Sequence, residues 1–167
     1  MGIPLIDLHK GIVPGWQQNI KRLIDMVVSI ASFILLLPLM LYTAIRVRLS
    51  SNGPIVYLQE RIGHKGKPFI MYKFRSMYVD AEKNGPLLSN DADTRITKWG
   101  KVMRKWRLDE LPQLLNIFKG EMSLVGPRAE RQFYINQIVQ LHPEYKYLFK
   151  AKPGLSSWGM VKFGYAS

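Results

Sequence analysis

The hydrophobic pattern of the chain is dominated by one apolar run near its N-terminal end. Residues 26–45 read MVVSIASFILLLPLMLYTAI and contain no charged side chain. As an α-helix, a run of this length extends about 30 Å, the hydrocarbon thickness of a bilayer. Buried helices of soluble proteins rarely stay uniformly apolar beyond about 14 residues, and no small-residue cleavage site follows the run as in a signal peptide. The pattern therefore predicts a membrane helix.

The flanks and the interior of this run bear on how it sits in the membrane. Positive charge prefers the cytoplasmic side of a membrane. Here it stands at both ends of the run, in Lys21, Arg22, Arg46 and Arg48. Pro38 lies inside the run, where it removes a backbone hydrogen bond and kinks or breaks a helix. These features favour a re-entrant helix over residues 21–48 that enters and leaves by the cytoplasmic face. A spanning helix with a tolerated proline kink is the alternative.

Shorter patterns follow the apolar run. Two β-prone runs, 55–58 and 69–74, are separated by a Gly- and Lys-rich stretch and predict a β-hairpin. Apolar residues then recur at helical intervals before position 109, again just after it, and once more over residues 132–140. The sequence thus predicts an α+β fold that is mostly helical, with interfacial amphipathic helices and a small β-hairpin unit beside the membrane helix.

Composition narrows the chemistry that the chain can carry. The 167 residues include 24 Lys and Arg against 12 Asp and Glu, a formal charge of 24 − 12 = +12. With 47% hydrophobic residues, the chain is not an acidic or disordered tail. It has no cysteine and three scattered histidines, which excludes thiolate chemistry and a thiolate or histidine metal cluster. The positive surplus predicts an anionic partner: nucleic acid, anionic lipid or a phosphorylated small molecule.

One acidic pair stands at the end of the most basic segment. Residues 98–107 hold five bases and no acid, and Asp109 and Glu110 follow them. Such a site suits a diphosphate, because bases neutralise phosphate oxygens, carboxylates hold a divalent cation and one carboxylate can attack phosphorus. The surrounding bases should keep Asp109 ionised despite its acidic neighbour. Asp109 could equally cap a helix that begins near Leu111, and both roles can coexist because helix N-termini also bind phosphate.

A second anchor for phosphate lies further along the chain. The stretch Val125-Gly126-Pro127-Arg128 sets an arginine on a rigid Gly-Pro turn, where a bidentate phosphate contact is feasible. Serine hydrolase, P-loop and dinucleotide-binding fingerprints are missing from the sequence. The residues alone leave three classes open: an enzyme acting on a diphosphate, a basic membrane-surface or nucleic-acid-binding module, and a membrane scaffold. A module that binds a polyanion has no use for two acids within its basic segment.

Five motifs stand in a characteristic order along the chain. They are Lys21-Arg22-Leu23-Ile24-Asp25, Gln59-Glu60-Arg61-Ile62-Gly63, Tyr72-Lys73-Phe74-Arg75-Ser76-Met77, Arg107-Leu108-Asp109-Glu110-Leu111-Pro112-Gln113 and Met122-Ser123-Leu124-Val125-Gly126-Pro127-Arg128. In that order, over about residues 20–160, they resemble the bacterial sugar transferases. These are the monotopic phosphoglycosyl transferases that start capsule, exopolysaccharide and glycoprotein glycan assembly.

The resemblance implies a reaction. A UDP-sugar would give its sugar 1-phosphate to undecaprenyl phosphate at the cytoplasmic face of the bacterial inner membrane, with Mg²⁺ or Mn²⁺, yielding a polyprenyl diphosphate sugar and UMP. In the family, the aspartate of the Asp-Glu pair forms a covalent phospho-sugar intermediate. That role falls on Asp109, with Glu110 assisting at the metal or in proton handling, so both are the expected catalytic and metal-binding residues. Membrane lipid is an expected partner and nucleic acid is not, while a homo-oligomer is left open.

The resemblance also implies roles for the remaining motif residues. Four basic residues are expected to bind the phosphates or the uridine of the substrate: Lys73, Arg75, Arg104 and Arg128. Lys21, Arg22 and Asp25 are expected to form a structural cluster at the membrane surface, and Pro38 is expected to break the re-entrant helix.

These expectations divide the chain into three parts. Residues 1–20, with scattered Gly and Pro, are a connecting segment, residues 21–48 the re-entrant helix, and residues 49–167 the cytoplasmic catalytic domain. Family members usually continue past the position of Ser167, so the domain is expected to be truncated at its C-terminal end. The usual Gln-Val-Asn-Gly-Arg stretch is replaced by residues 160–164, which leaves the identity of the sugar open.

Overall fold

A single long helix runs along one side of the molecule. The computed structural model describes residues 14–83, 93–157 and 162. Its first element, α1 (Gly15–Ser50), has 36 residues and is the one helix in the described ranges that is long and apolar enough to cross a membrane. It begins before and ends after the predicted range 21–48, so the end of the predicted connecting segment is helical.

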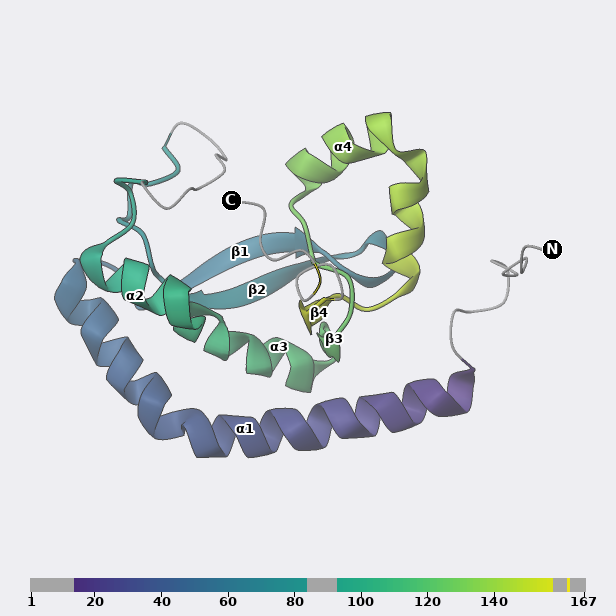
Figure 1. Cartoon of the computed structure of the whole chain (residues 1–167), viewed down its shortest axis with the longest axis horizontal. Helices are drawn as coiled ribbons and strands as arrows, with labels where there is room; N and C mark the ends of the chain where they lie inside the picture. The colour runs from purple at the N-terminus through teal and green to yellow at the C-terminus, as the bar shows by residue number, and fades with distance from the viewer. Residues whose placement is uncertain (1–13, 84–92, 158–161, 163–167) are drawn as a thin grey trace.

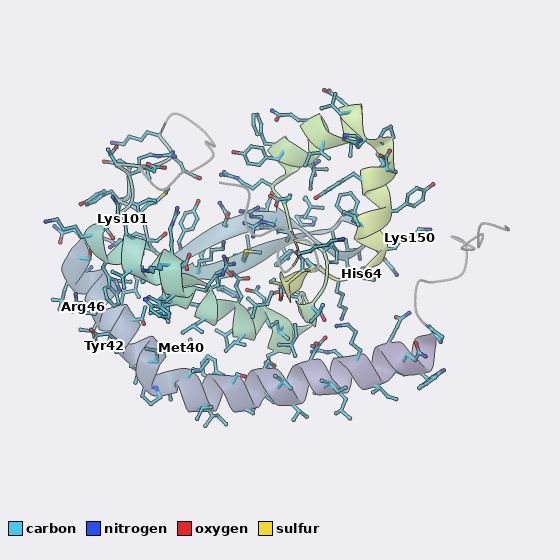
Figure 2. All side chains as sticks on the ribbon, in the orientation of Figure 1. Met40, Tyr42, Arg46, His64, Lys101 and Lys150 are labelled. Atoms are coloured by element: carbon cyan, nitrogen blue, oxygen red, sulfur yellow. The ribbon has the colours of Figure 1, made fainter. Side chains whose placement is uncertain are left out.

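Pro38 bends α1 without interrupting it. The helix is continuous through the proline, and Figure 1 shows its axis turning between a long first arm and a shorter second arm. Met40, Tyr42 and Arg46 lie on the second arm (Figure 2). Proline has no N–H to donate and crowds the carbonyl four residues earlier, which is sufficient to bend the axis. The expected break is therefore a kink in the backbone.

The rest of the described chain forms a small mixed unit against α1. Its elements are β1 (Val56–Ile62), η1 (His64–Gly66), β2 (Pro68–Phe74), α2 (Lys98–Trp106), η2 (Leu108–Gln113), α3 (Leu114–Lys119), β3 (Ser123–Val125), α4 (Gln132–Leu141), η3 (Pro143–Lys150) and β4 (Gly154–Ser156). In Figure 1, α2 and α3 lie between α1 and the β1–β2 hairpin, while α4 and η3 project beyond the hairpin. The mostly helical α+β class is confirmed.

Two short sheets organise this unit. β1 and β2 pair antiparallel, from Val56 opposite Phe74 to Ile62 opposite Pro68, which confirms the predicted hairpin. β3 and β4 pair parallel across a long connection that contains α4 and η3. The sequence contains no local signal for this second sheet. Parallel strands are joined by a long crossover connection, so they pair only after distant segments of the chain have come together.

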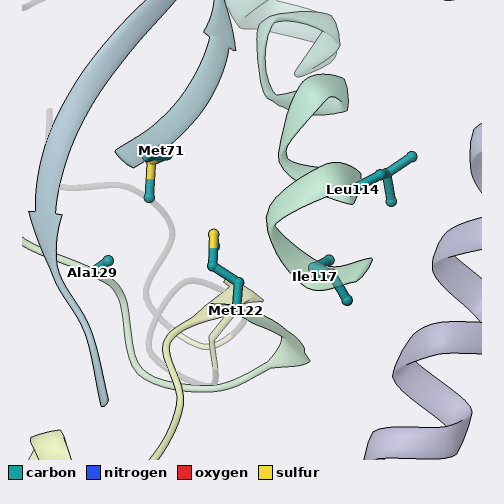
Figure 3. Close-up of a cluster of buried hydrophobic side chains, with 5 residues drawn as sticks. All are labelled: Met71, Leu114, Ile117, Met122 and Ala129. Carbon is teal, nitrogen blue, oxygen red and sulfur yellow. The ribbon is translucent and has the colours of Figure 1, made fainter. Parts of the chain in front are cut away.

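The hydrophobic core consists of two clusters. Figure 3 shows the first, in which side chains from β2, α3 and the following segments meet and Met71 and Met122 point toward each other. Its members are Met71, Leu114, Ile117, Met122 and Ala129. The second joins the second arm of α1 to β2 and α2 through Met40, Val47, Phe74 and Met103. Both clusters include residues of β2, so β2 is the element on which the helices are assembled.

A buried asparagine fixes α3 against the outer edge of β2. The side chain of Asn116 is fully buried, and its Oδ1 accepts a hydrogen bond from the backbone N–H of Tyr72 at 3.0 Å. Its Nδ2 donates to the carbonyl of Ile70 at 2.7 Å and to Glu121 Oε2 at 2.7 Å. The amide thus satisfies backbone groups that a third strand would otherwise satisfy. Because η2 directly precedes α3, this contact also sets η2 beside β2.

The basic residues at the start of α1 reach into the small unit. Arg22 donates from Nη1 to the carbonyl of Ile117 at 2.5 Å and from Nη2 to the carbonyl of Phe118 at 2.6 Å. These carbonyls belong to the last turn of α3, whose C-terminal groups lack partners within the helix. Arg22 therefore caps α3 from α1.

The acid of the same motif makes a matching contact. Asp25, buried on α1, accepts a hydrogen bond from the backbone N–H of Leu124 at 3.1 Å. Lys21 pairs with Asp25 at 3.5 Å and donates to the hydroxyl of Ser123. All of these partners hold the first arm of α1 to β3, so the contacts of this motif are those of a structural cluster.

The outward side of α1 stays uncovered in the described part of the chain. Only 11% of its most apolar 18-residue window is buried. Ile34 is 67% exposed, Leu35 78% and Leu41 57%. A continuous apolar surface of this size marks a membrane or partner contact, because exposing it to water is unfavourable.

Candidate active site

One face of the β1–β2 hairpin supplies the floor of a small recess. The register places Tyr57 opposite Lys73, and Arg61 opposite Phe69. Because side chains alternate along a strand, Arg61 and Lys73 project from the same face, together with Met71. The recess above this face is lined by Arg61, Met71, Lys73, Glu110, Gln113, Arg128, Ala129, Gly154 and Leu155.

A left-handed residue turns the chain toward this recess. α2 ends at Arg107, whose φ is 59°, and the Arg107 N–H bonds back to the carbonyls of Arg104 and Met103. Left-handed backbone costs a residue with a Cβ about 1 kcal/mol and is found disproportionately at functional sites. The turn starts η2, so Asp109 and Glu110 fall in its first turn.

The alternative that the sequence left open, Asp109 as the cap of the following helix, is wrong. The residue at the N-cap position of η2 is Arg107, and no side-chain hydrogen bond caps the start of this element. The chain turns two residues before Asp109, so its carboxylate is inside the element rather than at its boundary. The Asp109 side chain is therefore not used as a helix cap. The sequence alone could not distinguish this capping role from a chemical one.

Glu110 is held between two cations from different elements. Lys73 Nζ lies 3.7 Å from Glu110 Oε1, and Arg107 donates from Nη2 to Glu110 Oε2. Burial lowers the pKa of Lys73, and the negative charge of Glu110 opposes that effect. Since each carboxylate oxygen has a cationic partner, Glu110 stabilises a buried lysine while staying at the edge of the recess.

Asp109 is the more buried acid of the pair, with 9% of its surface exposed. Burial raises the pKa of Asp109, and Glu110 adds to this, against the lowering effects of Lys73, Arg104 and Arg107. The sequence led us to expect the bases to outweigh the neighbouring acid. In the structure the pKa of Asp109 nevertheless rises, because removing the carboxylate from water disfavours its charged form.

Contacts at the start of α2 determine the position of Arg104. Thr97 caps α2 by accepting a hydrogen bond from the Gly100 N–H at 2.9 Å, and the Thr97 N–H donates to the carbonyl of Ser76 at 3.0 Å. Arg104 Nε then donates to Ser76 Oγ at 2.9 Å. Burial lowers the pKa of Arg104, while the negative charge of Asp109 raises it. α2 is thus fixed to the end of β2 with its arginine facing Asp109.

The structure does not bring Arg75 to the recess. Its Nη2 donates to the carbonyl of Ser51 at 2.6 Å and to Ser51 Oγ at 2.9 Å, and its backbone N–H donates to the carbonyl of Ile55. The side chain is buried at the connection between α1 and β1, apart from the residues that line the recess. Of the other three basic residues expected to bind substrate, Lys73 and Arg128 line the recess together with Glu110. Arg104 does not line the recess but interacts electrostatically with Asp109.

Sequence reasoning missed three residues of this site. Arg61 could have been found, because strand alternation in the predicted hairpin places it on the same face as Lys73. Arg107 was counted in the basic segment and stands in the fourth motif, but it was given no role of its own. Gln113, buried in the lining of the recess, has no local signal that separates it from an ordinary core polar residue.

The acidic pair fits a magnesium ion in one particular mode. Among the described residues, no group of three or more His, Cys, Asp or Glu side chains could enclose a metal. Mg²⁺ is commonly held by one or two carboxylates together with water and substrate phosphates rather than by a protein cage. Asp109 and Glu110 supply that number of carboxylates beside a basic recess.

The described residues thus combine a long helix with an uncovered apolar side, a buried aspartate next to a partly buried glutamate, and a basic recess. Residues 16–167 match the family model described as bacterial sugar transferase. The chain belongs to this family.

Several relatives match most of the chain. The UDP-N-acetylgalactosamine-undecaprenyl-phosphate N-acetylgalactosaminephosphotransferase of Aeromonas hydrophila is 44% identical over 89% of the chain and 35% of its own length. The UDP-glucose:undecaprenyl-phosphate glucose-1-phosphate transferase of Escherichia coli (strain K12) is 36% identical over 96% and 34%. The enzyme of the same name from Caulobacter vibrioides is 36% identical over 85% and 53%. The chain therefore spans about a third of the first two relatives and half of the third.

Proposed function

We propose that the protein transfers a sugar 1-phosphate from a UDP-sugar to undecaprenyl phosphate, giving undecaprenyl-diphosphate-sugar and UMP. The observation that carries the proposal is the buried Asp109 next to Glu110 on the wall of the recess, with Lys73, Arg104 and Arg107 near them. The activities for which the relatives are named support the same reaction class. Such a product would initiate exopolysaccharide, capsule or glycan synthesis.

The proposed mechanism has two displacements at one phosphorus atom. An Asp109 carboxylate oxygen attacks the β-phosphorus of the UDP-sugar, the bond from that phosphorus to the bridging oxygen breaks, and UMP leaves. A phosphate oxygen of undecaprenyl phosphate then attacks the phospho-sugar on Asp109. The phosphorus–carboxylate bond breaks, which restores Asp109 and forms the diphosphate. No proton needs to be removed from the nucleophile, because an ionised carboxylate attacks directly.

The surrounding cations have separate parts in this mechanism. Arg104 and Lys73, both beside Asp109, neutralise the charge that collects on the phosphoryl oxygens. Arg128 lines the recess and would hold the departing phosphate. Glu110, 3.7 Å from Lys73, opposes the lowering of the Lys73 pKa by burial. When Mg²⁺ or Mn²⁺ is bound, Asp109 and Glu110 would hold it, and the ion would neutralise diphosphate charge.

A basic module that merely binds lipid or nucleic acid explains the site less well. Such a module gains from exposed cations, whereas Lys73 and Arg104 are drawn inward around two acids. Burying Asp109 at a raised pKa is unfavourable for the fold and has no purpose in binding a polyanion.

Release of UMP tests the proposed reaction. We expect purified protein in nanodiscs to release UMP from at least one member of a panel of UDP-sugars, only when undecaprenyl phosphate and Mg²⁺ are present. Mass spectrometry of a reaction stopped before lipid addition should find the phospho-sugar on Asp109. A protein that stays silent with every sugar, including a version extended beyond Ser167, would contradict the proposal.

We also propose that α1 is re-entrant and that the protein sits on the cytoplasmic face of the bacterial inner membrane. The bend at Pro38 and the uncovered apolar side of α1 support this placement. Both arms of the helix contact the same small unit, the first through Arg22 and the second through Val47. A straight spanning helix would carry one arm away from that unit.

Cysteine labelling distinguishes the two placements. The chain has no cysteine, so Gln17→Cys and Asn52→Cys, both at exposed positions, each introduce a single thiol at one end of α1. We expect a membrane-impermeant maleimide to label both in inside-out vesicles and neither in intact spheroplasts. Labelling of only one of the two in spheroplasts would show that α1 spans the membrane.

A further inference from the structure

A single carboxylate joins two of the arginines that line the recess. Glu130 Oε2 lies 2.9 Å from Arg61 Nη1, and Glu130 Oε1 accepts a hydrogen bond from Arg128 Nε at 3.0 Å. Each oxygen of the carboxylate thus has one guanidinium partner. Arg61 comes from β1, whereas Arg128 follows β3, so Glu130 connects two walls of the recess.

Arg61 is the fixed member of this group. Its side chain is 10% exposed, and its Nε and Nη2 both donate to Gln59 Oε1, at 3.0 and 2.7 Å. Its Nη1 also donates to the carbonyl of Ala129 at 3.0 Å, and the Ile62 N–H donates to the carbonyl of Glu130. Arg61 therefore anchors the side chain of Glu130 to the hairpin, and the neighbouring Ile62 anchors its backbone.

Arg128 is the more exposed member. Its side chain is 43% exposed, and a long arginine side chain loses rotamer entropy when it is immobilised. The bond from its Nε to Glu130 restricts the guanidinium before any ligand arrives. Restriction of this kind strengthens binding, because less freedom is lost on forming the complex.

We propose that Glu130 is a positioning residue that holds Arg128 in the orientation that receives the diphosphate of the donor, with Arg61 as its buried anchor. The inference rests on the proposed function for the identity of the ligand. It gives Glu130 no contact with the reacting atoms. Its influence runs through Arg128, so it disappears when Arg128 is absent.

A double-mutant cycle tests this dependence with UDP as the probe. The four proteins are the wild type, Glu130→Gln, Arg128→Ala and the double variant, with UDP affinity measured by calorimetry in nanodiscs. We expect Glu130→Gln to weaken UDP binding about tenfold when Arg128 is present and less than twofold when it is absent. Equal effects in both backgrounds would show that Glu130 acts only on the fold and would overturn the inference.

Two further variants serve as a control and as a replacement in the double-mutant cycle. Glu82→Gln removes a carboxylate from another arginine pair, with Arg131 at 2.8 Å, that does not line the recess, and should leave UDP affinity unchanged. If Glu130→Gln does not fold, Glu130→Asp replaces it in the cycle, because a shorter carboxylate keeps the charge near Arg61 but cannot reach both arginines. The same coupling criterion then decides.

The outcome is separable from that of the proposed function. Wild-type protein that turns over UDP-sugar while the cycle is additive contradicts only the role of Glu130. Coupling in UDP affinity without any UMP release contradicts only the reaction. If the wild-type protein does not bind UDP, both the positioning role of Glu130 and the assignment of the ligand are wrong.

Discussion

Asp109→Asn is expected to lower UMP release by roughly 10⁴-fold or more and to raise the thermal stability of the protein at neutral pH. Asparagine has nearly the same shape but cannot attack phosphorus, so the proposed first displacement is lost. The stability gain has a separate cause. Burial and Glu110 raise the pKa of Asp109, which means that the folded protein disfavours the ionised carboxylate. The neutral amide removes that penalty.

The pH dependence of this gain follows from the direction in which the pKa moves. Because the pKa of Asp109 is higher in the folded than in the unfolded chain, the folded state keeps its proton longer as the pH rises. The free energy of unfolding therefore falls between the ordinary aspartate pKa of about 3.9 and the raised pKa. The gain from Asp109→Asn is complete above that window and absent below it.

Thermal melts at neutral pH and below pH ~3.9, together with UMP release, check both halves of the prediction. Asp80→Asn is the matched control, since Asp80 is 67% exposed and pairs across a surface turn with Lys83 at 2.9 Å. It should change neither stability nor turnover. If Asp109→Asn destabilises the protein at neutral pH, Asp109 is a structural counter-ion for Lys73 and Arg104 rather than a nucleophile.

Local patterns in the sequence were sufficient for the elements that depend on local physics. The apolar run predicts α1, alternation predicts the β1–β2 hairpin, and helical spacing predicts α4 within one residue at its C-terminal end. The membrane helix differs in one respect. Pro38 was expected to break it, but the backbone bends and stays helical, because the second arm is held by packing of Met40 and Val47 on Phe74.

The sequence predicts those parts of the site that do not depend on contacts with distant residues. Arg61 and Arg75 both stand in motifs on or beside the hairpin, yet Arg61 lines the recess and Arg75 binds Ser51. The two arginines differ in the distant residues that they contact, and the spacing of residues along the sequence does not reveal those contacts. The same limit explains the pKa of Asp109, since counting neighbouring bases cannot account for burial that arises only when η2 packs against β2.

Gly126→Ala is expected to lower the free energy of unfolding by about 3 kcal/mol. The molecules of this variant that remain folded are expected not to bind UDP. A Cβ at this position would lie 2.2 Å from the carbonyl oxygen of Lys152 and 2.9 Å from the backbone nitrogen of Gly154. Backbone atoms cannot move aside as side-chain tips can. The bonds at risk join Gly126 N–H to the Ser156 carbonyl at 3.0 Å and Gly154 N–H to the Pro127 carbonyl at 2.9 Å.

Gly126→Ala affects binding as well as stability because the β3–β4 contact stands directly before Arg128. Separating the strands moves the arginine and also Gly154 and Leu155, which line the same recess. Gly15→Ala is the control, because a Cβ there meets nothing within 4 Å at the start of α1, and it should melt and bind UDP as the wild type does. A melting temperature about 10 °C lower and undetectable UDP binding are expected for Gly126→Ala. Wild-type affinity in that variant would mean that Arg128 is positioned by Glu130 alone, without the parallel strands beneath it.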